Sequence, residues 1–446
     1  MKQKQIIKNA CVVTDNLSKI QDVLIEDGLI TRIDNSISHS TAEIFEANGN
    51  FLLPGLIDDQ VHFREPGLIH KATIATESRA ALAGGVTSYM EMPNVNPQSV
   101  TIELLEQKYA IASHNSAVNY SFYLGATNEN LEEIKKVNPE TVCGVKIFMG
   151  SSTGDMLVDR QRSLEGIFRD SPVLIATHCE CETRVKDRFR DALDSLGENM
   201  DPSMHPVIRD EVACYLSSSL AVELANKFQS RLHVLHITTA LELSLFRNDI
   251  PLQDKRITSE VCVHHLHFSD EDYPTLGNLI KCNPAIKKPS NREALWDGLR
   301  SGKLDLIATD HAPHTWEEKQ QVTSKSPAGL PLVQHSLQLM LEKMDQGLIT
   351  IEMLVEKMCH NPAILYAVKN RGFIREGYAA DLVLINKKDY QVTNDNILYK
   401  CGWSPLQDSI FKYSIDKVWV NGTLGWNHAS GLTNTYDAQR LEFTRR

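Results

Sequence analysis

Short apolar runs alternate with longer amphipathic segments through the central part of the chain. Eight runs rich in β-branched and other apolar residues predict strands: 51–58, 86–92, 118–126, 142–149, 173–178, 232–238, 256–263 and 304–310. Between most of them lie helical segments such as 101–112 and 209–228, and in the latter apolar residues recur at i, i+3 and i+4. This alternation predicts an α/β protein with a (β/α)8 TIM barrel.

The two ends of the chain show a different pattern, of short strands and tight turns. Strand-like stretches at 6–14, 22–34 and 43–53 are broken by Asp-Gly and Asn-Gly-Asn turns, and similar stretches recur at 377–386 and 415–424. We expect one small β-sandwich domain assembled from both termini. The predicted domains are therefore residues 1–52 and 375–446 for the β-sandwich and residues 53–374 for the barrel.

Composition and charge narrow the class of protein. The 446 residues are 42% hydrophobic and 23% charged, which is ordinary for a globular protein. A net charge of -11 argues against a nucleic-acid or membrane partner, but leaves room for a local basic pocket. The nine cysteines are scattered, mostly in apolar runs, and indicate free thiols rather than a disulfide framework. No stretch approaches 18 apolar residues, so we expect a cytoplasmic protein.

Residues suited to metal binding and catalysis stand at the C-terminal ends of the predicted strands. Taken singly, each has a structural explanation, such as a hydrogen-bonded core histidine. A doubly wound sheet would also accept the alternation of strands and helices, but it would not collect such residues from six successive strand ends. The C-terminal face is where barrels of this kind place their chemistry. The six residues are His62, Asn94, Lys146, His178, His236 and Asp310.

Lys146 lies inside the apolar run VCGVKIFMG, where strand alternation turns its side chain into the barrel. A buried charged lysine is costly, and desolvation lowers its pKa. A neutral amine can react with carbon dioxide to form a carbamate, which is an anionic oxygen ligand able to bridge two metal ions. Asp310 follows another apolar run, where an unpaired carboxylate would be equally costly.

Several motifs resemble those of dihydroorotases, in the cyclic amidohydrolase superfamily. They are PGLIDDQVHFREPG, EMPNVNP, CGVKIFMGSSTG, ATHCE, VLHITT, KCNPAIK and ATDHAPH. The resemblance runs from about residue 5 to 424, and TDHAPH and the lysine segment are its most specific parts. It implies a zinc enzyme, with one or two ions per chain. Such an enzyme reversibly closes N-carbamoyl-L-aspartate into (S)-dihydroorotate in pyrimidine biosynthesis.

The resemblance also implies roles for individual residues. The metal ligands would be His62, His178, His236, Asp310 and, as a bridging carbamate, Lys146; Asp310 would also be the general base. The substrate would be held by Arg64, Asn94, Asn283, His314, Ala328 and Gly329. Arg64 separates substrate classes, because a guanidinium can bind the carboxylate of dihydroorotate through two hydrogen bonds. Relatives that act on uncharged rings, dihydropyrimidinases and allantoinases, usually lack this arginine.

Gln60 departs from the pattern expected of a metal site. Asp58, Gln60 and His62 stand at alternate positions, so a strand would place them on one face. Two histidines at that spacing would form a metal-binding pair, whereas a neutral amide is a weak zinc ligand. We expect the ion held by His178, His236 and the carbamate to be the tighter one. Two alternatives stay open: a related cyclic amidase, or an inactive dihydroorotase-like assembly partner.

Residues 315–327, TWEEKQQVTSKSP, are polar and carry no clear period. The segment is either an exposed linker or a mobile lid, since loops above the catalytic face of a barrel often cover the substrate. The expected partner is a small-molecule substrate. The sequence leaves the formation of a homo-oligomer open.

Overall fold

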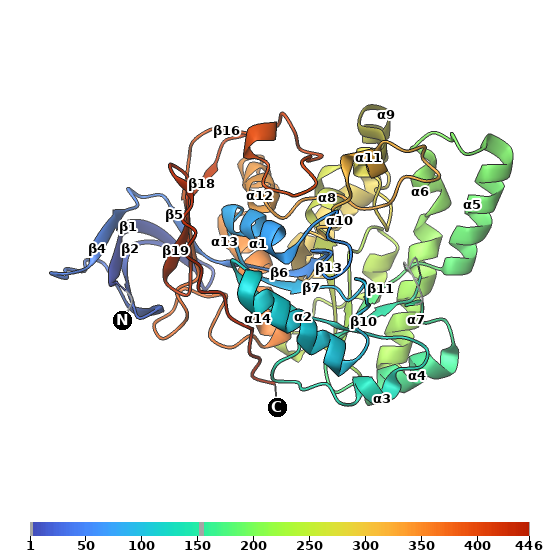
Figure 1. The fold of residues 1–446 in the computed structure, drawn as a ribbon, viewed down its shortest axis with the longest axis horizontal. Coiled ribbons are helices and arrows are strands. Elements are labelled where there is room, and N and C mark those ends of the chain that lie inside the picture. Colours follow the sequence, from blue (N-terminus) through green and yellow to red (C-terminus); the bar gives the residue numbers. More distant parts are fainter. Residues whose placement is uncertain (1–2, 151–155, 446) are drawn as a thin grey trace.

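The barrel strands occur where the hydrophobic pattern predicts them. In the computed structural model, which describes residues 3–150 and 156–445, β6, β7 and β8 pair in parallel, and so do β9 to β14 in chain order. A parallel bridge between Val61 and His311 joins the first strand to the segment after the last one. The predicted (β/α)8 barrel is confirmed (Figure 1). Its third strand is interrupted at residue 123 and consists of β8 (Asn119–Phe122) and β9 (Leu124–Gly125). The other seven are β6 (Leu56–Val61), β7 (Val86–Glu91), β10 (Val145–Phe148), β11 (Ile175–His178), β12 (Leu232–Val234), β13 (Ile257–Cys262) and β14 (Leu306–Ala308).

Amphipathic helices cover the outside of the barrel. The helix predicted at 209–228 is α7, which begins after Asp210, whose side chain accepts a hydrogen bond from the backbone N–H of Ala213. Its alanines and Leu224 are buried against the barrel. The longer helices are α1 (Ile74–Ala83), α2 (Ile102–Asn115), α4 (Gln161–Asp170), α5 (Glu182–Leu196), α7 (Glu211–Phe228), α10 (Pro289–Ser301) and α12 (Ser336–Asp345). Shorter ones are α3 (Leu131–Ile134), α6 (Met204–Ile208), α8 (Val263–His267), α9 (Tyr273–Leu276), α11 (Trp316–Lys319), α13 (Ile351–Val355) and α14 (Asn361–Tyr366).

Both ends of the chain build one nine-stranded mixed sheet, which confirms the predicted terminal β-domain. Its order is β20-β19-β18-β15-β5-β1-β2-β3, and β4 pairs with β1. Figure 1 shows this sheet at the left of the barrel, with blue N-terminal strands beside red C-terminal ones. The strands are β1 (Gln5–Thr14), β2 (Leu17–Glu26), β3 (Leu29–Asp34), β4 (Glu43–Glu46), β5 (Phe51–Pro54), β15 (Leu382–Asn386), β18 (Ser414–Val420), β19 (Thr423–Asn427) and β20 (Gly431–Leu432).

The stretch 51–58, predicted as one barrel strand, is divided at Gly55. β5 joins the terminal sheet by pairing with β1 and β15, and β6 begins the barrel. At Gly55 a Cβ atom would lie 2.0 Å from the Thr87 hydroxyl oxygen, so only glycine lets the chain pass from the sheet to the barrel. The predicted domain boundary between residues 52 and 53 falls inside β5.

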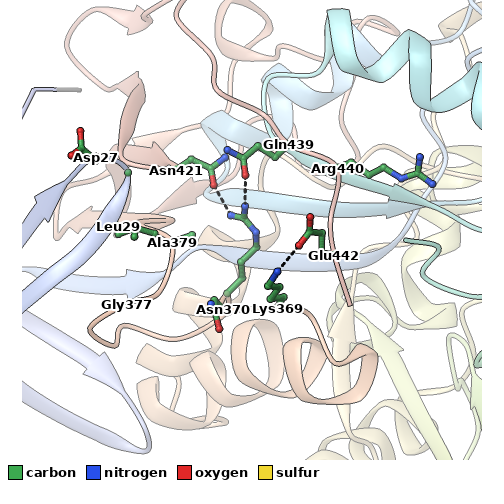
Figure 2. Close-up of a pocket in the computed structure, with 12 residues that line it drawn as sticks. Asp27, Leu29, Lys369, Asn370, Gly377, Ala379, Asn421, Gln439, Arg440 and Glu442 are labelled. Carbon is green, nitrogen blue, oxygen red and sulfur yellow. Dashed lines mark hydrogen bonds and ion pairs between the residues drawn. The ribbon is translucent and has the colours of Figure 1, made fainter. Parts of the chain in front are cut away.

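The C-terminal region, predicted as part of the β-domain, also contacts the barrel. Arg440 bridges to Tyr120 and Phe443 bridges to Val368. The side chains of Leu441 and Phe443 are buried in the apolar cluster that fills the barrel interior. A pocket of about 250 Å³ lies beside this tail, and in it the Arg371 guanidinium donates to Asn421 and Gln439. Figure 2 shows the lining of this pocket, with Lys369 paired to Glu442.

The predicted free thiols are confirmed, since all nine cysteines are free and most are buried. Within the residues that the structure describes, no helix is long and apolar enough to cross a membrane.

Candidate active site

A cavity of about 200 Å³ at the C-terminal end of the barrel strands gathers the residues that the sequence analysis assigned to the site. Strand ends and the loops after them supply these side chains, as expected for a barrel. Phe148, Ala312 and Pro327 also line the cavity, and the sequence had not singled them out. The assigned residues that line it are Gln60, His62, Arg64, Asn94, Lys146, His178, His236, Asn283, Asp310, His314, Ala328 and Gly329.

One side of the cavity is built around Asp310. Nε2 of His62 lies 3.1 Å from Oδ1 of Asp310, and the Gln60 amide donates to the same oxygen at 3.1 Å. Nδ1 of His62 lies 2.8 Å from the Asn94 amide oxygen, to which it donates, so Nε2 is left to face Asp310. Burial alone would raise the pKa of Asp310, but the hydrogen bond and charge of His62 outweigh it and lower the pKa.

The strict alternation expected for Asp58, Gln60 and His62 is interrupted. The pairing of β6 with β7 is irregular between Asp58 and Val61, which indicates a β-bulge. Gln60 and His62 line the cavity, whereas the Asp58 carboxylate accepts a hydrogen bond from the Thr309 hydroxyl at 2.6 Å. The expectation that all three side chains share one face is therefore wrong for Asp58.

On the other side of the cavity, His178 and His236 face each other. Nδ1 of His178 lies 3.0 Å from Nε2 of His236. Nε2 of His178 lies 3.0 Å from the buried Glu180 carboxylate, which orients the ring and leaves Nδ1 as the inward atom. Burial would raise the pKa of Glu180, but the Arg209 charge and His178 lower it to about 2. Nδ1 of His236 is buried without a hydrogen-bond partner among the described residues.

Lys146 lies between these two groups on β10. Its side chain is 1% exposed, and burial lowers its pKa to about 8. Nζ lies 4.8 Å from the centre of the Phe148 ring, and it forms no hydrogen bond or ion pair with residues 3–150 or 156–445. A buried amine in this state fits conversion to an anionic carbamate that is neutralised by metal ions.

A network of buried, hydrogen-bonded side chains lies next to the site and contacts the backbone of His236. Nε2 of His233 lies 3.1 Å from the Glu260 carboxylate and 3.4 Å from that of Asp59. The other Glu260 oxygen accepts a hydrogen bond from the His236 backbone N–H. Sequence reasoning missed Glu180, Asp59 and Glu260, although each is an acidic residue inside or beside an apolar run, which is the signal that identified Lys146.

Three residues of the site adopt left-handed backbone conformations. The φ angles are 67° at Arg64, 40° at His236 and 46° at Asp310. Such strain costs about 1–3 kcal/mol per residue and persists where the surrounding structure enforces it. The three strained residues are therefore positions where the backbone conformation directs a side chain into the cavity.

Arg64 and His314 form the substrate side of the cavity. Nε of Arg64 donates to the Pro313 carbonyl oxygen at 3.0 Å, and one terminal nitrogen lies 3.1 Å from the His314 ring. Burial lowers the pKa of Arg64 to about 10, so the guanidinium is still a cation at pH 7. At Gly329, where φ is 141°, a Cβ would lie 2.4 Å from the Ala312 carbonyl oxygen. Only glycine brings this backbone so close to the cavity.

The segment 315–327 is anchored beside this side of the site, and its Pro327 lines the cavity. It contains the short helix α11, and the Lys319 side chain is 1% exposed. The Lys319 ammonium donates to the carbonyl oxygens of Lys281, Pro327 and Gly329 at 2.9–3.2 Å. The interpretation as an exposed linker is wrong for the part around Lys319, and the interpretation as a mobile lid stays a prediction.

The donor set fits a divalent metal. Two imidazole nitrogens 3.0 Å apart, an unpartnered nitrogen of His236 and an unpaired buried lysine lie beside a carboxylate and a third imidazole. Fold and site together define an amidohydrolase, a class whose members typically depend on a metal. Residues 215–425 match the model of the Amidohydrolase family, and residues 49–164 match that of the Dihydro-orotase-like family.

Curated relatives identify the family more closely. A dihydroorotase of Methanosphaera stadtmanae is 31% identical over 90% of this chain and 92% of its own length. A dihydroorotase of Halobacterium salinarum is 31% identical over 92% of this chain and 96% of its own. The chain belongs to the dihydroorotase family.

Solved structures agree on the fold. The L-hydantoinase (dihydropyrimidinase) of Arthrobacter aurescens matches with a TM-score of 0.93 at 24% identity, over 99% of this chain and all of that one. The dihydropyrimidinase of Brevibacillus agri matches with a TM-score of 0.89 at 21% identity, over the whole of both chains. At this level of identity the likeness concerns the fold alone.

Proposed function

We propose that this protein is a zinc-dependent dihydroorotase that interconverts N-carbamoyl-L-aspartate and (S)-dihydroorotate. The observation that carries the proposal is the single cavity in which the buried Arg64 guanidinium faces the same space as His62, Lys146, His178, His236 and Asp310. A cation beside a metal-type donor set suits a cyclic amide that also carries a carboxylate.

One ion would be held by His178, His236 and Lys146 as a carbamate, and the other would be held by His62, Asp310 and the same carbamate. Gln60 offers the second position no firm ligand, because its neutral NH2 group is engaged by Asp310. We therefore expect the first ion to be the tighter one and the second position to be partly filled in limiting zinc. Zinc supplies a polarised carbonyl and a water of lowered pKa at neutral pH.

Asp310 moves the proton. It accepts a proton from the attacking water and passes it to the ring nitrogen as the amide C–N bond breaks. The reverse sequence closes the ring. The Gln60 amide donates to Oδ1, and Nε2 of His62 lies 3.1 Å from the same atom, so the carboxylate is held in place; its lowered pKa keeps it ionised and able to accept a proton.

Arg64 binds the substrate carboxylate through two parallel N–H donors at the edge of its planar guanidinium. His314 and the Pro313 carbonyl hold the guanidinium in position, so little side-chain entropy is lost when the substrate binds. Asn94, Asn283 and the backbone at Ala328 and Gly329 supply the polar groups for the rest of the ring.

The test is a ring-opening assay of the zinc-loaded protein with dihydroorotate, and with dihydrouracil as the uncharged ring of the same size. The proposal expects turnover of dihydroorotate and a much lower kcat/KM for dihydrouracil. Preference for the uncharged ring would instead support the related cyclic amidase. Absence of turnover on both rings, with zinc bound, would support the inactive assembly partner.

A further inference from the structure

A second group of metal-ligand side chains lies directly beyond Gln60. Cys262 ends β13, and His264 and His265 belong to the short helix α8 that follows it. One ligand atom from each of these three residues lies within 4.8 Å of the other two. All three side chains are at most 3% exposed. None of them belongs to the donor set of the catalytic cavity.

The histidines of this group have unpaired nitrogens. His264 is 0% exposed, its ring approaches the Thr309 backbone, and neither ring nitrogen forms a well-aligned hydrogen bond within the described part of the chain. Nδ1 of His265 is equally unpaired, while its Nε2 lies 3.0 Å from the Pro284 carbonyl oxygen. A buried polar atom without a partner is destabilising, so the unpaired nitrogens of these two adjacent rings call for a ligand.

The thiol connects this group to the cavity. Sγ of Cys262 lies 3.8 Å from the Gln60 amide oxygen. Zinc bonds of about 2.3 Å to sulfur and 2.1 Å to nitrogen or oxygen, at a tetrahedral angle, place two ligand atoms roughly 3.6 Å apart. The Gln60 amide is already oriented, because its NH2 group donates to Asp310 and its oxygen is left on the side of Cys262.

Another buried cluster, formed by Asp59, His233 and Glu260, lacks such unpaired rings. Nδ1 of His233 lies 2.8 Å from the Thr258 hydroxyl and Nε2 lies 3.1 Å from Glu260. Its histidine is therefore satisfied by protein atoms, and the cluster is explained by its support of His236.

We propose that Cys262, His264 and His265 form an additional metal site for Zn²⁺ or a similarly soft divalent cation, with the Gln60 amide oxygen as the fourth ligand. The Cys262 thiol loses its proton to solvent as the sulfur–metal bond forms, and both imidazoles bind as neutral rings. Four protein ligands make a closed tetrahedral set, which is typical of structural zinc. This ion ties the end of β13 to β6 beneath the cavity, and it does not depend on the proposed function.

X-ray absorption at the zinc edge of the purified, zinc-loaded protein tests the site without any substitution. The proposal expects a zinc–sulfur distance of about 2.3 Å in the scattering pattern. The catalytic donor set contains nitrogen and oxygen only, so zinc confined to it gives no sulfur shell. A spectrum without sulfur overturns the proposal.

Substitution of cobalt for zinc identifies the thiol. The wild-type cobalt protein is expected to show a sulfur-to-cobalt charge-transfer band in the near ultraviolet. Cys262→Ser should lose that band and about one ion per chain, and His264→Gln should lower the metal content in the same way. Cys359→Ser is the matched control, since Cys359 is also 0% exposed but lies elsewhere, against the Pro54 carbonyl. A band that survives in Cys262→Ser overturns the proposal.

Discussion

Asp310 is the residue on which the proposed proton transfer depends. Its Oδ1 atom is engaged by His62 and Gln60, so the geometry of the carboxylate is set before substrate binds. Asp310→Asn keeps a similar shape but cannot accept a proton. We expect kcat to fall by about 10²–10⁴-fold while KM changes little, as steady-state kinetics would measure. Unchanged kcat with a raised KM would show that Asp310 only binds.

Arg64 is the residue that defines the substrate class. Arg64→Lys keeps the charge but loses the planar donor pair and the hydrogen bond to Pro313. A hydrogen bond to a charged group contributes about 1.5–3 kcal/mol, so KM for dihydroorotate should rise by roughly 10–100-fold. Arg247→Lys, at an exposed salt bridge, is the matched control and should leave KM unchanged. A normal KM in Arg64→Lys would place the substrate carboxylate elsewhere.

At the scale of single residues, the sequence identified those with an unusual position in a buried strand. Lys146 and Asp310 stand out because a charge follows or interrupts an apolar run. Glu180 and Glu260 were missed, because their roles depend on contacts with histidines and Arg209 that only the folded barrel brings together. An acidic residue in an apolar run is a visible signal, but the sequence does not show which histidine that residue will orient.

At the scale of elements, the predicted strands were accurate where the whole apolar run lies in one sheet. Buried parallel strands are short, continuous apolar runs. They are therefore easily distinguished from amphipathic helices, in which apolar residues recur every three or four positions. The run 51–58 was wrong as a single strand, because β5 and β6 are both apolar but belong to different sheets. The bulge near Asp58 was not foreseeable either, since it follows from how β6 pairs with β7.

The position of the segment 315–327, which contains α11, is predicted to depend on Lys319. Lys319→Met keeps the apolar length of the side chain but removes the donors to three carbonyl groups, including that of Gly329. Unsatisfied buried carbonyls cost about 1–3 kcal/mol, so urea denaturation should give a lower free energy of unfolding. KM should rise because the backbone beside the substrate shifts. Lys325→Met, in an exposed ion pair of the same segment, is the control that should change neither quantity.

At the scale of the whole molecule, the C-terminal tail packs against the barrel through Leu441 and Phe443. Phe443 is 3% exposed and packs with residues of the barrel interior. Phe443→Ala should lower the free energy of unfolding by about 3–5 kcal/mol, measured by chemical denaturation. Ile410→Ala, at a side chain that is 62% exposed, should have a small effect. Equal losses in both variants would contradict this role of the tail.

The overall architecture was predictable because two patterns extend over long parts of the chain. They are the alternation of apolar strands with amphipathic helices in the centre, and the short strands with tight turns at both ends. The route of the tail was not predictable, since residues 436–445 contain few apolar positions and no regular period. Its anchoring comes from individual contacts, such as those of Arg440 with Glu106 and of Arg445 with the Val142 carbonyl. Long-range contacts of this kind leave no local signal.

The most direct test of the account is Lys146→Ala, assayed for zinc content and for dihydroorotate turnover. Without the lysine no carbamate can form, so metal and activity should be lost together, and short carboxylic acids added to the buffer should restore part of both. Lys108→Ala would be an unsuitable control because that lysine pairs with buried Glu91; the exposed Lys136→Ala should retain full activity and zinc. Full activity and full zinc content in Lys146→Ala would contradict the account.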